Sequence, residues 1–359
     1  MLALIIIGVL LIFTFLVVAH EFGHFLVARR EGVRVREFGV GFPPRLFSRK
    51  KNGTIFSINA LPLGGFVRLK GEDGEEKGKD SFTTQGFWAK TRIIMAGVVV
   101  NLAIAYLIFT FLLIIGIPPL GQKLPSLGAI KPQSMGDSNL VIYNVSKDSA
   151  ALRSDLRQGD SIISIDDMQI LDNSSLRSFT SAHQGQTVDV SLRRNGQLYH
   201  KSVTLGSDQK AGYLGVSAEK TQLSRYPFWA APIASIILMF QFVWATLAAF
   251  GGLIVGLFVH HAVSDQVTGP IGIVSLFSQV VNFGPRFMLL FIASISLSLG
   301  VVNALPIPAL DGGRQFVLIL KKIGFKISPE REGLVHFIGF IALISLMVII
   351  SIGDIIKLR

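Results

Sequence analysis

The sequence predicts a polytopic α-helical membrane protein with one inserted domain that is mostly β. Three observations predict this fold class. Half of the 359 residues are hydrophobic, and 16% are charged. Several uncharged runs reach the roughly 20 residues that span a bilayer. Between two of these runs, from 120 to 225, charged residues and short alternating patterns return, as expected for a domain in water.

The formal net charge of +11 does not indicate a nucleic-acid-binding protein. The basic residues gather in loops beside apolar runs, where the positive-inside rule explains them. The chain has no cysteine, so disulfide bonds and thiolate metal sites are excluded. We therefore expect a lipid bilayer, and no nucleic acid, around this protein.

Residues 1–28 are predicted to form a first transmembrane helix that carries candidate metal ligands. Its end holds the pattern His20-Glu21-x-x-His24. On a helix, residues i and i+4 share a face, so both imidazoles can reach one ion while Glu21 stays free to accept a proton from water. Such polar groups are costly in lipid unless they are paired or metal-bound. The segment lacks the basic start of a signal peptide, so we expect it to be retained.

Residues 29–91 are predicted to form a cytoplasmic loop. The stretch from 29 to 92 contains 14 Lys or Arg and 7 Asp or Glu, which favours the cytoplasmic side. The amino terminus would then face outside. Within the loop, 53–58 and 61–69 have the composition of two strands, the second entered through glycine and proline.

Residues 92–119 are predicted to form the second transmembrane helix. Gly97 and Asn101 lie four residues apart on one face of it. This spacing is equally compatible with close helix packing and with a role near the candidate metal site. Because this helix crosses from the cytoplasmic loop, the segment that follows it should be extracytoplasmic.

Residues 120–225 are predicted to form that extracytoplasmic domain. Between 123 and 225 there are 12 basic and 10 acidic residues, a balance typical of a soluble domain. Short alternating runs and the turn at Asn195-Gly196 indicate β-hairpins.

The last third of the chain contains three apolar stretches, at 227–259, 287–305 and 334–352. The basic loop before the last stretch should lie on the cytoplasmic side, so an odd number of crossings must separate it from the extracytoplasmic domain. A further crossing through 272–283 would also satisfy the count. The stretch 227–259 is interrupted at Gly251-Gly252, so we expect it to lie in the interface or to fold back as a hairpin. We predict interfacial or re-entrant helices over 226–285, a third transmembrane helix over 286–312, a basic cytoplasmic loop over 313–333, and a last transmembrane helix with a tail over 334–359.

Asp311 is the best candidate for a third metal ligand. Hydrolytic zinc sites usually take three protein ligands and leave one position for water. The segment from Asn303 to Gly313 contains two prolines two residues apart, which break a helix, and a Gly-Gly pair that lets the backbone turn. The remaining histidines fall in the soluble domain or beside apolar stretches, where they are weaker candidates: His183, His200, His260, His261 and His336.

These motifs together resemble the site-2 protease family, the RseP-type zinc metalloproteases of peptidase family M50 that carry out regulated intramembrane proteolysis. The matching features are the histidine motif, the N-x-x-P-x-P-x-L-D-G motif from Asn303 to Gly312, the inserted domain, and Gly269-Pro270-Ile271-Gly272. The resemblance implies that His20, His24 and Asp311 bind Zn²⁺ and that Glu21 is the general base.

The resemblance also implies substrate-binding elements. Asn303 would contact the substrate backbone or the developing oxyanion. The strands around Gly64 and Gly65 resemble the membrane-associated β region of the family, which holds substrate as an added strand. The inserted domain resembles a PDZ domain, with Gly212, Leu214 and Gly215 in its carboxylate-binding loop. Two departures matter: one PDZ-like domain is present where the best-known enterobacterial members have two, and valine follows Gly97 where many members have proline.

The expected substrates are single-pass membrane proteins, such as anti-sigma factors or remnant signal peptides, already shortened by a site-1 protease. The enzyme would be a multi-pass protein of the bacterial inner or plasma membrane, with its active site near the cytoplasmic side. Two alternatives remain from the residues alone. An intramembrane metal transporter would use the same ligands without needing Glu21, and an inactive PDZ scaffold would lack zinc.

Overall fold

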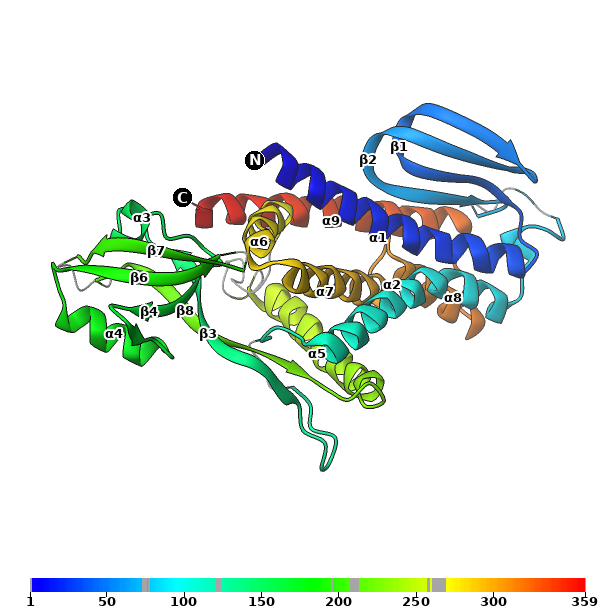
Figure 1. Cartoon of the computed structure of the whole chain (residues 1–359). Helices are drawn as coiled ribbons and strands as arrows, with labels where there is room; N and C mark the ends of the chain where they lie inside the picture. Colours follow the sequence, from blue (N-terminus) through cyan, green and yellow to red (C-terminus); the bar gives the residue numbers. More distant parts are fainter. Residues whose placement is uncertain are drawn as a thin grey trace. The chain divides into compact units, whose positions relative to one another are not determined.

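The computed structural model describes residues 2–72, 76, 78–120, 124–194, 196–206, 213–256, 259 and 269–358. Its chain divides into two compact units. The first consists of Met1–Leu107, Met239–Phe277 and Ile292–Arg359, and the second of Ile108–Leu238 and Ser278–Phe291. Figure 1 labels the helices and strands of both units.

Five helices in the described part of the chain are long and apolar enough to cross a membrane. This finding confirms the prediction of a polytopic helical membrane protein. A shorter apolar helix, α6 (Pro270–Phe283), precedes the fourth of the five. The five are α1 (Leu2–Arg30), α2 (Phe87–Ile115), α5 (Ala231–Val255), α7 (Pro285–Ala304) and α9 (Pro329–Leu358).

The sequence predicts an interfacial or a re-entrant arrangement for the segment that forms α5. The re-entrant alternative is wrong for residues 231–255, and the interfacial one stays a prediction. This segment is one continuous helix of 25 residues and counts among the candidate spans. Gly251 and Gly252 lie inside the helix. A glycine costs a helix only about 1 kcal/mol, whereas breaking the backbone hydrogen bonds of an apolar segment in lipid costs several. The glycine pair therefore does not break the helix.

Strands β1 (Val35–Lys51) and β2 (Thr54–Leu69) form a curled antiparallel sheet that contacts α1 (Figure 1). Both strands are long and fold back, so the first part of β1, residues 37–40, pairs on two sides. Gly39, for example, pairs with both Phe66 and Ser57. Within the described residues, 65–69 pairs only with β1. This segment is therefore an edge of the sheet. The sequence predicted both halves of β2 but not β1.

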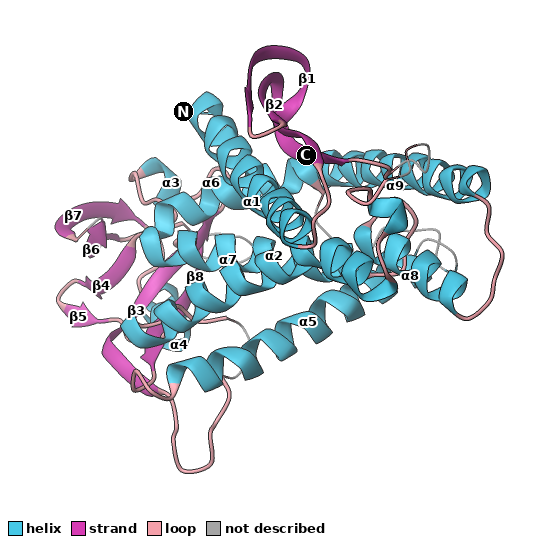
Figure 2. Ribbon diagram, turned by 90° about the vertical axis from the view of Figure 1, so that its right-hand side faces the viewer, coloured by secondary structure: helices cyan, strands magenta, loops and turns pink. Residues whose placement is uncertain are grey.

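The second unit contains a sheet with strand order β7-β6-β4-β3-β8, with β5 paired to β4. Leu140, Ile142 and Val190 lie in its hydrophobic core, which also receives side chains from α3 (Ala150–Arg153) and α4 (Asn173–Ala182). This arrangement is consistent with the predicted PDZ-like domain, whose strands are labelled in Figure 2. The strands are β3 (Gln133–Val145), β4 (Ser161–Ile165), β5 (Met168–Gln169), β6 (Thr187–Arg194), β7 (Gln197–Thr204) and β8 (Val216–Arg225).

The proline motif interrupts the helices as predicted. Helix α7 ends at Ala304, and α8 (Asp311–Lys322) begins at the candidate ligand. The glycine pair is needed for a different reason from the one expected. A Cβ on Gly312 would lie 2.2 Å from the Leu305 carbonyl oxygen, and one on Gly313 would lie 2.1 Å from the carbonyl oxygen of Ile307. The first turn of α8 therefore packs directly on the preceding loop.

The loop before α8 is held by the last span. Ala309 has a φ of 76°, a left-handed conformation that costs a residue with a Cβ about 1–2 kcal/mol. Its N–H donates a hydrogen bond to Nδ1 of His336 in α9, at 2.8 Å. This bond fixes the backbone two residues before Asp311.

Candidate metal centre and active site

Three candidate ligand atoms converge in the first unit. His20 and His24 lie four residues apart near the end of α1, and Asp311 is the first residue of α8. The Nε2 atoms of the two imidazoles are 3.1 Å apart. Oδ2 of Asp311 lies 2.9 Å from Nε2 of His20 and 3.4 Å from Nε2 of His24. The structure therefore brings together the three residues that the sequence placed at one metal site.

Two groups of helix α2 orient the imidazoles by contacting their Nδ1 atoms. Nδ1 of His24 donates to the carbonyl oxygen of Ile93, at 2.8 Å, which leaves its Nε2 with a free lone pair. Nδ1 of His20 lies 3.2 Å from the side-chain amide of the buried Asn101. The two ends of an amide are assigned from hydrogen bonding, so Oδ1 can take this place and accept from Nδ1–H of His20. In that arrangement both Nε2 atoms face Asp311 as acceptors.

Glycines allow α1 and α2 to approach so closely. A Cβ on Gly97 would lie 2.4 Å from Nε2 of His20 and 2.5 Å from Nε2 of His24. A Cβ on Gly23 would lie 2.7 Å from the carbonyl oxygen of Ala96. Helix α7 supports α2 in turn, because Ser296 donates a hydrogen bond to the carbonyl oxygen of Asn101, at 2.8 Å. Gly97 therefore leaves the space that the two imidazoles occupy.

The donor set fits a zinc ion. Two imidazole nitrogens and one carboxylate oxygen are common zinc ligands, and tetrahedral bonds of about 2.1 Å place ligand atoms about 3.4 Å apart. Oδ2 of Asp311 is buried and has no hydrogen-bond donor among the described residues. A buried carboxylate oxygen without a donor is available as a metal ligand.

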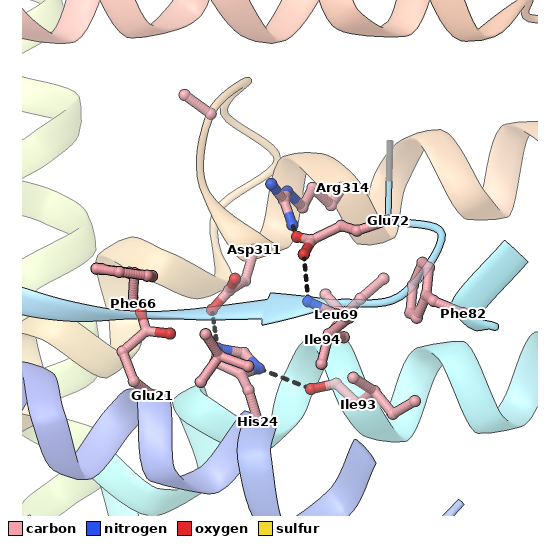
Figure 3. Close-up of a pocket in the computed structure, with 12 residues that line it drawn as sticks. Glu21, His24, Phe66, Leu69, Glu72, Phe82, Ile93, Ile94, Asp311 and Arg314 are labelled. Atoms are coloured by element: carbon pink, nitrogen blue, oxygen red, sulfur yellow. Dashed lines mark hydrogen bonds and ion pairs between the residues drawn. The ribbon is translucent and has the colours of Figure 1, made fainter. Parts of the chain in front are cut away.

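Glu21 lines a cavity of about 260 Å³ beside these ligands. The cavity walls include His24, Asp311 and, from the edge of the β1–β2 sheet, Phe66 and Val67. Figure 3 shows the Glu21 and His24 side chains below the strand and the Asp311 side chain reaching toward His24. Glu21 is not one of the three converging ligand groups, so its carboxylate remains free to exchange a proton in the cavity.

The other predicted substrate-binding residues lie in different places. Gly64 and Gly65 lie in β2 above α1, and a Cβ on Gly65 would come within 3.8 Å of Cγ of Glu21. Asn303 lies in the last turn of α7 and is not among the described residues that line the cavity. Leu214 and Gly215 belong to the second unit, where Leu214 is part of the core. The predicted site residue Gly212 lies outside the described residues, as do His260 and His261.

Two charged residues of the cavity wall were missed by the sequence analysis. Glu72 follows β2, and Arg314 lies one turn into α8; they form an ion pair at the cavity wall. A signal for Arg314 was present, because it follows Asp311 by three residues and so shares a helix face with it. Glu72 lies in a charged, glycine-rich connector that gave no such signal.

Comparison with known proteins agrees with this geometry. The model of peptidase family M50 matches residues 8–346. The zinc metalloprotease RasP of Geobacillus kaustophilus is 28% identical, over 98% of this chain and 98% of its own length. The regulator of sigma-W protease RasP of Bacillus subtilis is 29% identical, again over 98% of both chains. The chain therefore belongs to peptidase family M50, and the protein is a multi-pass bacterial intramembrane zinc metalloprotease of the site-2 protease family.

Proposed function

We propose that this protein is an endopeptidase that cleaves the transmembrane segments of single-pass membrane proteins, with His20, His24 and Asp311 as zinc ligands and Glu21 as general base. The observation that carries the proposal is the convergence of these ligand atoms beside an unpaired strand edge. A metal site alone would suit several functions. A metal site under a strand edge suits a peptide substrate in particular.

A bound zinc ion supplies Lewis acidity, which lowers the pKa of a water ligand and polarises a carbonyl group. The residues of the chain supply the rest. Glu21 accepts the proton of the attacking water and passes it to the leaving amine. Asn101 and the Ile93 carbonyl oxygen hold the imidazoles in the required tautomer through Nδ1. Asn303, at the end of α7, contacts the substrate backbone or the oxyanion.

A transmembrane helix is a poor substrate as it stands, because its carbonyl groups are bonded within the helix. The edge segment 65–69 offers replacement hydrogen bonds to an unwound chain. Phe66 and Val67 of this segment line the cavity together with Glu21. A substrate added to this edge as a further strand would therefore pass the candidate ligands in extended form, as hydrolysis requires.

The substrates that fit this site are anti-sigma factors or remnant signal peptides that a site-1 protease has already shortened. One relative carries the name regulator of sigma-W protease, which supports the first class. We place the active site near the cytoplasmic side and the PDZ-like domain outside, where that domain would exclude intact substrates or bind a newly exposed chain end through the loop around Leu214 and Gly215.

Metal removal combined with a cleavage assay tests the proposal. The purified protein should contain about one zinc ion per chain and cleave a single-pass model substrate in detergent. Chelation should abolish cleavage, and added zinc should restore it. Zinc-replete protein that cleaves neither a full-length nor a shortened single-pass substrate would contradict the proposed function.

Replacement of Asn101 by alanine should weaken zinc binding about 10- to 100-fold, because Nδ1 of His20 loses the group that orients it. The measurement is zinc affinity by competition with a chromogenic chelator. Thr110→Val is a matched control, since the Thr110 hydroxyl is also buried in α2 but has no hydrogen-bond partner among the described residues. Equal zinc affinities for the two variants would remove Asn101 from the site.

A further inference from the structure

The end of the edge segment is occupied by a side chain of the protein itself. The N–H of Leu69 donates a hydrogen bond to Oε2 of Glu72, at 3.2 Å. The next amide, of Lys70, donates to the carbonyl oxygen of Arg34, on the side of β1. Successive N–H groups of a strand point to opposite sides. The Leu69 N–H therefore belongs to the outward row, together with that of Val67, which an added strand would use.

Arg314 holds Glu72 in this position. Its guanidinium forms an ion pair with Oε1, the other carboxylate oxygen of Glu72 (Figure 3). Arg314 lies one turn after Asp311 on α8, and both members of the pair line the cavity with Glu21. The Glu72 side chain is 21% exposed. The pair thus connects the end of β2 to the helix that carries a candidate metal ligand.

Other ion pairs in the same unit do not share this feature. Glu31 pairs with Arg92 at 2.7 Å, and Asp80 pairs with Lys70 at 2.6 Å. Neither carboxylate accepts a hydrogen bond from the N–H of a β2 residue in the described structure, and neither lines the cavity beside Glu21. An ion pair can therefore stabilise this unit without placing a carboxylate on the edge of the sheet.

Building on the proposed function, we infer that Glu72, held by Arg314, determines where the substrate strand ends. Its carboxylate takes the place of a substrate carbonyl oxygen on the Leu69 N–H. An added strand can then pair with the outward row as far as Val67 but not beyond. Because strands change register in steps of two residues, about 6.8 Å, this block selects which peptide bond lies at the catalytic groups. Glu72 and Arg314 are specificity-determining residues, not catalytic ones.

The test is a map of the cleaved bonds by mass spectrometry of the products from one transmembrane substrate. Wild-type protein should give one dominant cut. Glu72→Ala frees the Leu69 N–H, so it should raise the ratio of products displaced by two residues to the main product about fivefold, because one added hydrogen bond changes a register equilibrium by about that factor. Glu72→Gln retains an acceptor for this N–H and should stay closer to the wild-type pattern.

Glu31→Ala is the matched control, because it removes an ion pair of the same unit without freeing a strand amide. Zinc content should be unchanged in all variants. An identical product pattern in Glu72→Ala and Glu31→Ala would overturn the inference, even if both cut more slowly. Should Glu72→Ala fail to fold, Arg314→Gln, which releases the carboxylate from α8, must show the displaced products instead, and an unchanged pattern there overturns it equally.

The two proposals fail in different ways. No cleavage by zinc-loaded wild-type protein would overturn the proposed function and this inference with it. If cleavage depends on zinc and Glu21 but the product pattern is the same in the wild type and in the Glu72 and Arg314 variants, only the inference is overturned.

Discussion

Replacement of Glu21 by glutamine is expected to lower cleavage of a single-pass substrate by about 10²- to 10⁴-fold, the usual contribution of a general base. Glutamine has nearly the same shape as glutamate but cannot accept the proton of the attacking water. Glu21 is not one of the converging ligand groups, so zinc content should stay at the wild-type value. Cleavage is measured as initial rate in detergent, and zinc by elemental analysis of the same sample.

Glu31→Gln is the control for this experiment. Glu31 directly follows α1, the helix that carries Glu21, and it pairs with Arg92. Loss of its charge should therefore leave cleavage unchanged. The comparison also separates a protease from a metal transporter that uses the same ligands. Zinc transport that persists in Glu21→Gln protein, without any cleavage by the wild type, would favour the transporter.

The convergence of His20, His24 and Asp311 could be predicted from the sequence because its signals are local. The spacing of His20 and His24 determines a shared helix face, and the prolines before Asp311 determine where the helix must break. Such rules involve a few neighbouring residues. The structure adds only that these two segments, nearly 300 residues apart, meet at one point.

The residues around the ligands could not be assigned in the same way, because their roles depend on contacts between distant segments. Gly97 and Asn101 stood out as a small residue and an amide on one face of α2, but the sequence does not reveal which helix they contact. Their position against the imidazoles emerges only from the packing of α1 on α2. Glu72 likewise becomes informative only once the edge of the β1–β2 sheet is known.

The predicted fold-back within the segment that forms α5 was wrong for a different reason. Counting charged loops constrains the number of crossings, but the length of a continuous apolar helix is decided by backbone hydrogen bonding in lipid. Gly251 and Gly252 gave a local signal for a break, and the cost of two glycines is smaller than that of the unbonded backbone groups a break would create.

Replacement of Asp311 by alanine should lower zinc affinity by more than the roughly 100-fold that loss of an orienting group produces, because a direct ligand disappears. The two imidazoles would remain, with their Nε2 atoms 3.1 Å apart. The anionic member of the three converging groups would be gone. Asp311→Asn should fall between alanine and wild type, since its amide oxygen can still coordinate but carries no charge. Cleavage should be lost in parallel with zinc.

The control for Asp311 is Asp80→Asn, which removes a carboxylate paired with Lys70 away from the metal ligands and should leave zinc binding intact. Zinc affinity is measured by competition at fixed pH, since ligand protonation competes with binding. The result has a structural consequence beyond the site. If Asp311 is a ligand, then zinc joins the end of α1 to the start of α8, and wild-type protein should lose more thermal stability on chelation than Asp311→Ala protein does. Equal zinc content in wild-type and Asp311→Ala protein would show that the third ligand comes from another residue, and the interrupted helix before α8 would then need a different explanation.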